Sequence, residues 1–443
     1  MTRTDRAQTL NGYYPSAWPV ECGGNRRQKA ARGGLFARDG EARVTTVKNG
    51  RWNVMMIQRG EGELFMGGTL AAFTGPPPHG WLQRLDPQTL EVLAESPALP
   101  CGEHVWCGAI AAHVNGDIYS VNGSYLHRLN AQCEVVLEKR LPVDQAHNGL
   151  LILSDGTIVT KDLRLAGQGG STITRLDPND LAVIGQPLVL PEGSMGRIAS
   201  DYTEGADFIY VPGIEHVWRI RVADNEMALD ASWQPKYRDQ PSEQGLAWDG
   251  CISANCLWMM DNGDIDPIRA IYGQHPNGRF EQASEKLSWR RPAPWSGGQR
   301  LLRIDLRSRE VSGIAPFHSP GKTPGGGIIA PPVNVPEHNL CIAWDSLNGK
   351  IAGIDTSRDQ LSSAWQLDAR PTMQPVAFPE TGELVINDFR DAGDFLIVVD
   401  ISSGEIIDEV NTGSSIANGM FLTPGWNRDV YYCSTLSCAR AAW

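Results

Sequence analysis

Residues 148–177 read NGLLILSDGTIVTKDLRLAGQGGSTITRLD, and this stretch is one copy of a unit that recurs along the chain. It contains an apolar run (150–153), a tight turn at Ser154-Asp155-Gly156, a second run that ends on Asp162, a glycine-rich loop and a third run that ends on Asp177. Short apolar runs bounded by Asp-Gly turns are typical of antiparallel β-strands. The stretch therefore predicts three short strands in succession.

The end of the third strand is the first marker of the repeat. An apolar residue followed by Asp, or by a close variant, recurs at Leu85, Leu129, Leu176, Ile220, Ile304, Ile354 and Val399. The interval between these positions is 44 to 50 residues, except for one interval of 84. Four short strands in about 45 residues are typical of one blade of a β-propeller.

The first strand of each unit is a second marker, and it indicates one more copy. These strands are expected to begin near Asn53, Gly108, Asn148, Gly196, Gly245, Gly326, Gln374 and Asn418. The last copy is incomplete, and the strands that it lacks are expected at 34–37 and 42–48. Joining the two ends of the chain in one blade closes the ring and leaves no open sheet edge. We therefore predict an all-β fold, an eight-bladed β-propeller whose closing blade uses both termini, with seven blades as the alternative.

Two short motifs resemble those of known propellers. The segment Val399-Asp400-Ile401-Ser402-Ser403-Gly404-Glu405-Ile406-Ile407 resembles the blade repeat of pyrroloquinoline-quinone-type propellers. The segments that begin at Asn148-Gly149-Leu150 and Asn418-Gly419-Met420 resemble the repeat of gluconolactonases and strictosidine-synthase-like propellers. These resemblances imply the propeller architecture and little of the chemistry.

Long connections are expected on one face of the ring, the face with the second-to-third and fourth-to-first strand loops. Residues 33–443 are predicted to form a single propeller domain, with a lid-like insertion at 262–298 that explains the interval of 84. Residues 1–32 are predicted to be a tail packed on the same face. Long loops on a rigid scaffold are often binding loops.

Candidate site residues come mainly from the positions just ahead of the first strands, which are expected to surround the mouth of the channel. Histidine and carboxylate can transfer protons, and arginine can hold an anion. The candidates for catalysis are His104, His147, Glu243, Arg197 and Asp261. The candidates for substrate binding are Trp52, Asn53, Trp106, Asn148, Met195, Gln244, Trp289, Trp295, His318, Lys322, Asp388 and Asn418. Each histidine has an alternative role as a donor to a neighbouring backbone carbonyl.

Four aspartates recur at the ends of the second strands. They are Asp162, Asp261, Asp345 and Asp388. Carboxylates around a ring could bind a divalent cation such as calcium, or they could hold the backbone amides of the loops that follow. The second interpretation is favoured because recurrence at one position of a repeat is typical of a structural role. No cofactor or metal ligand is assigned from the sequence.

Composition restricts the choice of partner and compartment. The formal net charge is −12, and cations are not clustered, so nucleic acid is not expected as a partner. No apolar run is long enough to cross a membrane, and the first 20 residues have no apolar core of a secretory signal. The nine cysteines, without a CxxC motif, are expected to be reduced thiols. We therefore expect a cytoplasmic protein, and the oligomeric state stays open.

The leading functional hypothesis is an enzyme that acts on a small, partly apolar organic molecule in the axial pocket. The available side chains suit hydrolysis, elimination or isomerisation, the reactions of a hydrolase, lyase or isomerase. The second hypothesis is a non-catalytic propeller that binds a protein or ligand on the same face. Quinone-dependent oxidation is a third hypothesis and ranks last, since the sequence has no adjacent cysteine pair.

Overall fold

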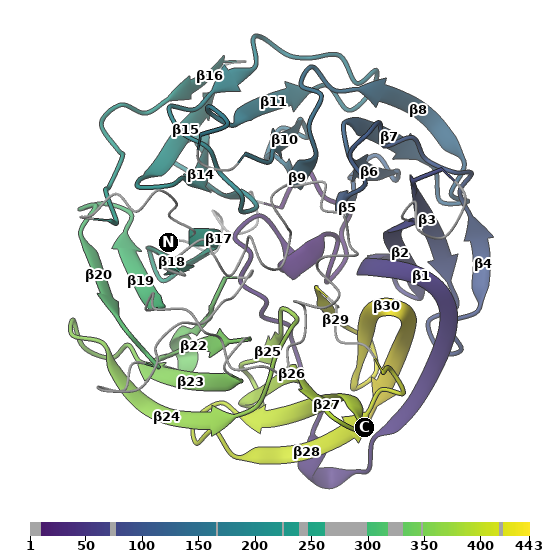
Figure 1. The fold of residues 1–443 in the computed structure, drawn as a ribbon, viewed down its shortest axis with the longest axis vertical. Helices are drawn as coiled ribbons and strands as arrows, with labels where there is room; N and C mark the ends of the chain where they lie inside the picture. The colour runs from purple at the N-terminus through teal and green to yellow at the C-terminus, as the bar shows by residue number, and fades with distance from the viewer. Residues whose placement is uncertain are drawn as a thin grey trace.

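The structure, a computed structural model, describes residues 10–70, 77–164, 167–223, 226–238, 247–261, 299–317, 331–346, 349–415 and 420–443. Its strands form seven antiparallel sheets arranged around a common axis (Figure 1). Six sheets have four strands, and the seventh has six. The chain is therefore an all-β propeller with seven blades.

Six blades each take four consecutive strands, from the axis outward. The second is β5 (Cys107–Ala112), β6 (Ile118–Asn122), β7 (Tyr125–Leu129) and β8 (Val135–Arg140), and the third is β9 (His147–Ile152), β10 (Ile158–Asp162), β11 (Thr172–Leu176) and β12 (Leu188–Val189). The fourth is β13 (Ala199–Thr203), β14 (Ala206–Pro212), β15 (Val217–Ala223) and β16 (Glu226–Leu229), and the fifth is β17 (Ala247–Ser253), β18 (Cys256–Asp261), β19 (Arg300–Asp305) and β20 (Val311–Ile314). The sixth is β21 (Val333–Val335), β22 (Leu340–Asp345), β23 (Lys350–Asp355) and β24 (Ser362–Asp368), and the seventh is β25 (Val376–Phe378), β26 (Glu383–Arg390), β27 (Gly393–Asp400) and β28 (Ile406–Asn411).

The remaining sheet joins the two ends of the chain. It is β29 (Leu422–Pro424), β30 (Asp429–Ala442), β1 (Arg43–Gly60), β2 (Glu63–Leu70), β3 (His79–Leu85) and β4 (Val92–Glu95), in that order. Residues 43–48 of β1 pair with 437–442 of β30, whereas residues 52–60 of β1 pair with 63–69 of β2. The predicted pairing of the N-terminal and C-terminal strands is therefore confirmed.

The predicted count of eight blades is wrong, and the length of β1 gives the reason. The sequence suggested that the strands at the chain ends form a blade of their own. Instead β1 is one continuous strand of 18 residues, so hydrogen bonding connects the terminal strands to the first blade in a single sheet. The expected strand at 34–37 is also absent, because residues 37–39 form the 3-10 helix η2 (Ala37–Asp39).

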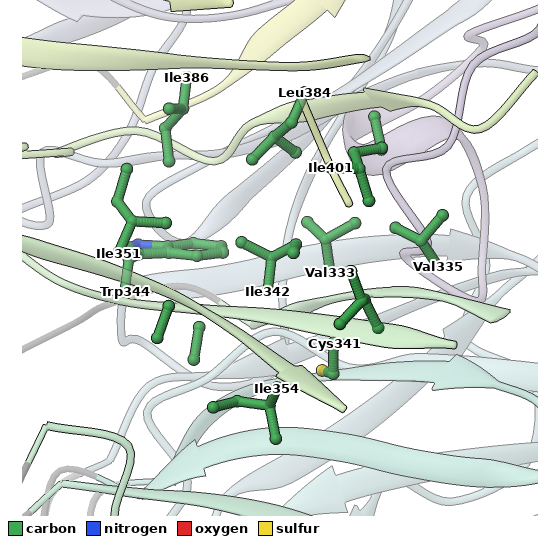
Figure 2. Close-up of a cluster of buried hydrophobic side chains, with 14 of the residues drawn as sticks. Val333, Val335, Cys341, Ile342, Trp344, Ile351, Ile354, Leu384, Ile386 and Ile401 are labelled. Carbon is green, nitrogen blue, oxygen red and sulfur yellow. The ribbon is translucent and has the colours of Figure 1, made fainter. Parts of the chain in front are cut away.

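The apolar core lies between neighbouring blades. The cluster in Figure 2 joins Ile342 and Trp344 of β22 to Leu384 and Ile386 of β26. All four side chains are almost completely buried. Because the blades bury their faces against each other, each blade needs both neighbours, and closure of the ring stabilises every sheet.

Residues 10–32, here called the axial segment, cross the centre of the ring (Figure 1). The segment contains the 3-10 helix η1 (Glu21–Gly23), and a third 3-10 helix, η4 (Pro336–His338), lies in the sixth blade. Backbone amides of the inner strands donate to the segment: Gln58 to the Trp18 carbonyl, Ala112 to Pro19, Ser200 to Asn25, Ile252 to Arg26 and Ala377 to Lys29. The segment contacts most of the inner strands in this way. The contacts lie on the side of the ring where each inner strand turns into the second strand of its blade. The free edges of these strands are thereby paired.

A buried carboxyl group ties the seventh blade to the closing sheet. Asp394 of β27 accepts hydrogen bonds from Asn387 Nδ2 at 2.9 Å and from the Tyr432 hydroxyl of β30 at 2.5 Å. Burial raises the pKa of Asp394 to about 7. The folded protein therefore holds this proton at pH values at which the unfolded chain has lost it.

We predict a pH dependence of stability that Asp394→Asn removes. Because the pKa of Asp394 is raised in the folded state, its protonated carboxyl stabilises the fold fully below about pH 4. This stabilisation, on the order of 4 kcal/mol, is lost as the pH rises to about 7. Urea unfolding at pH 5 and pH 8 measures it. The free energy of unfolding of the Asn variant minus that of the wild type should be larger at pH 8 than at pH 5. An unchanged difference between the two proteins would show that Asp394 is ionised in the folded state throughout.

No helix in the described ranges is both long and apolar enough to cross a membrane. All nine cysteines lie in those ranges and are free thiols, as the sequence suggested.

Candidate functional site

The candidate site lies where the inner strands begin, and there the backbones of neighbouring blades come very close. A Cβ atom on Gly108 would lie 2.2 Å from the His147 carbonyl oxygen, and one on Gly196 would lie 1.4 Å from the Trp248 carbonyl oxygen. Only glycine permits such an approach. The strand starts that the sequence suggested at Gly245 and Gly326 lie outside the described residues.

Arg197 is the centre of this region. It is fully buried, and its guanidinium lies over the Phe421 ring at 4.8 Å and near the Trp106 ring at 5.8 Å. Its Nε lies 3.0 Å from Glu21 Oε1 of the axial segment, and its backbone amide donates to Asp249 Oδ1 at 2.5 Å. The guanidinium of Arg197 is thus held between aromatic rings and the carboxylate of Glu21, while Asp249 holds the backbone of the same residue.

Four further predicted site residues are connected to Arg197. The rings of Trp52 and Trp106 meet edge to face, with 5.9 Å between their centroids. Trp106 Nε1 donates to Asn148 Oδ1 at 3.2 Å, and Asn148 Nδ2 donates to the Met195 carbonyl at 3.1 Å. The structure therefore brings Trp52, Trp106, Asn148, Met195 and Arg197 together from the first four blades.

The axial segment contributes charges that the sequence did not indicate. Arg27 Nη1 lies 2.6 Å from Glu21 Oε1, and Arg27 Nη2 lies 3.1 Å from Asp249 Oδ2. Glu21 and Asp249 are therefore each shared between Arg27 and Arg197. Gln374 Nε2 donates to Asp249 Oδ2 at 3.4 Å, and the Cys22 thiol donates to Gln374 Oε1 at 2.9 Å. We call this buried group of side chains the axial charge network: Glu21, Cys22, Arg27, Arg197, Asp249 and Gln374.

Polar atoms without a hydrogen-bond partner among the described residues lie together in this network. They are Glu21 Oε2, Arg27 Nε and Arg197 Nη1. Buried polar atoms in native proteins are almost always hydrogen-bonded, to protein, water or a ligand. A water molecule or a bound polar ligand would complete the hydrogen bonding of these three atoms.

His147 is buried and neutral at pH 7. Its Nδ1 donates to the Gln145 carbonyl at 2.9 Å, which leaves Nε2 as an acceptor, and no described residue bonds Nε2. Burial lowers the pKa of His147 to about 4, although the carboxylate of Asp162 opposes this shift. At neutral pH this imidazole can therefore accept a hydrogen bond or a proton through Nε2.

The other described candidates take part in contacts outside this cluster. His104 Nε2 donates to the Asp144 carbonyl at 2.9 Å. Asn53 Nδ2 donates to the carbonyls of Ser434 and Ser437 at 2.9 and 3.0 Å, within the closing sheet. Asp261 forms a buried ion pair with Arg238.

The recurring aspartates hold loops where their contacts are described. Asp388 accepts from the Arg370 amide at 2.7 Å and from Arg390 Nε at 2.6 Å. Asp162 accepts from the Thr172 amide at 2.5 Å and from Arg164 Nε at 2.6 Å. These bonds fit the loop-holding interpretation. Within the described ranges, no three His, Cys, Asp or Glu side chains are placed to hold a metal ion.

Several predicted residues lie outside the described part of the chain. They are Glu243, Gln244, Trp289, Trp295, His318, Lys322 and Asn418, together with the insertion at 262–298.

Sequence reasoning missed Asp249, Glu21, Arg27 and Lys161. Asp249 is the third residue of β17, which begins at Ala247, whereas the sequence suggested a strand start at Gly245 and candidate residues just ahead of it. Glu21 and Arg27 lie in a segment without periodic pattern. The sequence indicated Asp162, one of the four recurring aspartates, but it contained no signal for the neighbouring Lys161.

Comparison with solved structures shows the fold and no more. A quinohemoprotein alcohol dehydrogenase from Comamonas testosteroni matches with a TM-score of 0.62 at 10% identity, over 99% of this chain and 82% of the other. Its counterpart from Pseudomonas putida gives 0.63 at 11% identity, over 100% and 82%. The Sqt1 protein of Saccharomyces cerevisiae gives 0.52 at 9% identity, over 90% and 97%. This chain is similar to these proteins as a β-propeller. No family model and no curated protein matches the sequence.

Proposed function

We propose that the protein is a small-molecule enzyme that holds a partly apolar organic anion at Arg197 and acts on it by acid–base chemistry. The observation that carries the proposal is Arg197 itself: fully buried, set against Trp106 and Phe421, with Nη1 unpartnered among the described residues. A guanidinium binds carboxylates through its planar fork, and aromatic rings beside it suit the apolar part of a ligand.

The balance of buried charge supports an anion. Around the axis the described buried cations are Arg26, Arg27, Lys29, Lys161 and Arg197, and the described buried carboxylates beside them are Glu21, Asp201 and Asp249. Asp162 is paired with Arg164. Unbalanced buried charge is costly, and it is relieved by loss of a proton from lysine or by binding of an anion.

His147 is the proposed proton acceptor. Its Nε2 carries a lone pair, because Nδ1 donates to a backbone carbonyl, and its backbone is adjacent to Asn148, which bonds Trp106. His104 is not included, since its Nε2 is already bonded to the Asp144 carbonyl. No quinone-dependent step is proposed, since the similarity to quinohemoproteins is at the level of the fold.

Calorimetric titration with phenylacetate, a small aromatic carboxylate, tests the site. The wild type should bind it, and Arg197→Lys, which keeps the charge but loses the planar fork, should bind at least tenfold more weakly, about 1.4 kcal/mol. Arg219→Lys is the matched control. Arg219 also lies 5.0 Å from two aromatic rings, Phe208 and Trp233, and pairs with a carboxylate, but on β15 of the fourth blade. This variant should bind like the wild type.

Equal weakening in both variants, or no binding by the wild type, would overturn the proposal. The second result would favour the non-catalytic hypothesis. One observation favours a non-catalytic role, although on the rim of the ring rather than on the face with the long loops. Apolar side chains are exposed on the outer strands of three successive blades: Val92, Leu93, Val135, Val136 and Val189.

A further inference from the structure

Lys161 is a buried lysine whose amine contacts no carboxylate in the described residues. It lies on β10 of the third blade and is completely inaccessible to solvent. Its Nζ bonds two backbone carbonyl oxygens, that of Asp162 at 3.0 Å and that of Ser194 at 2.7 Å. Lysine is rarely buried completely without an ionic partner. The environment of this amine therefore needs an explanation.

The geometry matches a neutral amine better than an ammonium ion. A neutral amine has two hydrogens and one lone pair, and the two carbonyls accept both hydrogens. An ammonium ion would have a third hydrogen and a full charge with no ionic partner at bonding distance among the described residues. Burial also lowers the pKa of Lys161 to about 8, so the neutral amine is the main form above pH 8 and a minor form at pH 7. The nearby charge of Arg197 acts in the same direction, while Asp162 and Asp249 oppose it.

Lys161 belongs to the same buried region as the proposed anion site. Its Nζ donates to the carbonyl of Ser194, three residues before Arg197, and the next carbonyl, that of Met195, accepts from Asn148 of the site. A desolvated lysine with a lone pair is a nucleophile towards carbonyl carbon. A ligand that carries a carboxylate next to a carbonyl group presents one group to an arginine and the other to an amine.

We propose that Lys161 is a nucleophile that forms an imine with a 2-oxo acid whose carboxylate binds Arg197. The inference rests on the proposed function, because it requires the anion site. The Nζ lone pair attacks the keto carbon, and one amine hydrogen moves to the keto oxygen to give a carbinolamine. The carbinolamine then loses its hydroxyl and the remaining amine hydrogen as one water molecule. The new C=N bond takes the place of the C=O bond of the ligand and of the two N–H bonds of the amine. No oxidant or reductant is needed. Lys161 is thereby the residue that selects oxo acids from other carboxylates.

Trapping with phenylpyruvate and cyanoborohydride tests this proposal on the full chain. Cyanoborohydride supplies hydride to the imine carbon, and the adduct is located by peptide mass spectrometry. We expect the adduct at Lys161 in preference to the more exposed Lys139 and Lys350, and at least a tenfold loss of labelling at that site with Arg197→Lys. Phenyllactate, which has a hydroxyl in place of the keto group, should bind without forming an adduct.

The outcomes separate this inference from the proposed function. Arg197-dependent binding of phenylpyruvate without an adduct at Lys161 would overturn the imine and leave the anion site intact. Neither binding nor an adduct would overturn both. Because the adduct is located on the wild-type protein, the test does not depend on a folded Lys161 variant.

Discussion

Replacing Arg27 by Met should lower the free energy of unfolding by about 3–5 kcal/mol, because the change leaves two buried carboxylates without a shared partner. Arg27 Nη1 lies 2.6 Å from Glu21, and Nη2 lies 3.1 Å from Asp249. Methionine fills much of the volume but carries no charge. Glu21 keeps the guanidinium of Arg197, but Asp249 keeps only the Arg197 backbone amide and loses its cationic partner.

Arg38→Met is the matched control in the same N-terminal region. Arg38 forms ion pairs with Asp400 and Glu405 at 3.4 Å, but its side chain is 55% exposed. Exposed pairs contribute about 0–1 kcal/mol, so this variant should unfold almost like the wild type. Urea unfolding at pH 7, with the unfolding rate measured alongside, compares the two. Equal, small losses in both variants would show that the axial charge network does not stabilise the ring.

Gly196→Ala should destabilise the protein by more than about 4 kcal/mol or prevent it from folding, since a methyl group has no space there. The added Cβ would lie 1.4 Å from the Trp248 carbonyl oxygen and 2.2 Å from the carbonyl carbon, both backbone atoms. The fourth and fifth blades would have to separate. That separation would also weaken the bond from the Arg197 amide to Asp249, which closes the site on this side.

Gly40→Ala controls for the loss of glycine as such. Its nearest neighbour would be the Trp443 carbonyl carbon at 3.7 Å, an ordinary contact, and its backbone is extended. The free energy of unfolding of this variant should stay within about 0.5 kcal/mol of the wild type. Soluble expression and thermal unfolding of the two variants decide the matter. A Gly196→Ala protein as stable as Gly40→Ala would mean that the blades are not packed this closely.

The repeat could be predicted because each blade carries its own local signals. Turns such as Ser154-Asp155-Gly156 and apolar-Asp endings such as Leu176-Asp177 depend on nearby residues only. The count of blades could not be predicted in the same way. It depends on whether β1 continues through Asn49 and Gly50, and its pairing with β30 decides that continuity.

The site could be predicted only in part, for a related reason. Arg197, Trp106 and Asn148 stand at a fixed place in the repeat, so their convergence follows from the ring. Glu21 and Arg27 lie in a segment with no periodicity, and their positions follow from hydrogen bonds to strands far along the chain. Tertiary contacts of this kind leave no local pattern to recognise.

The most direct test of the account is a crystal structure of the protein grown with saturating phenylacetate. The account predicts density for the ligand on the propeller axis, with its carboxylate hydrogen-bonded to Arg197 Nη1 and its ring against Trp106. Ligand density only elsewhere, with Arg197 Nη1 bonded to protein atoms or water alone, would contradict it.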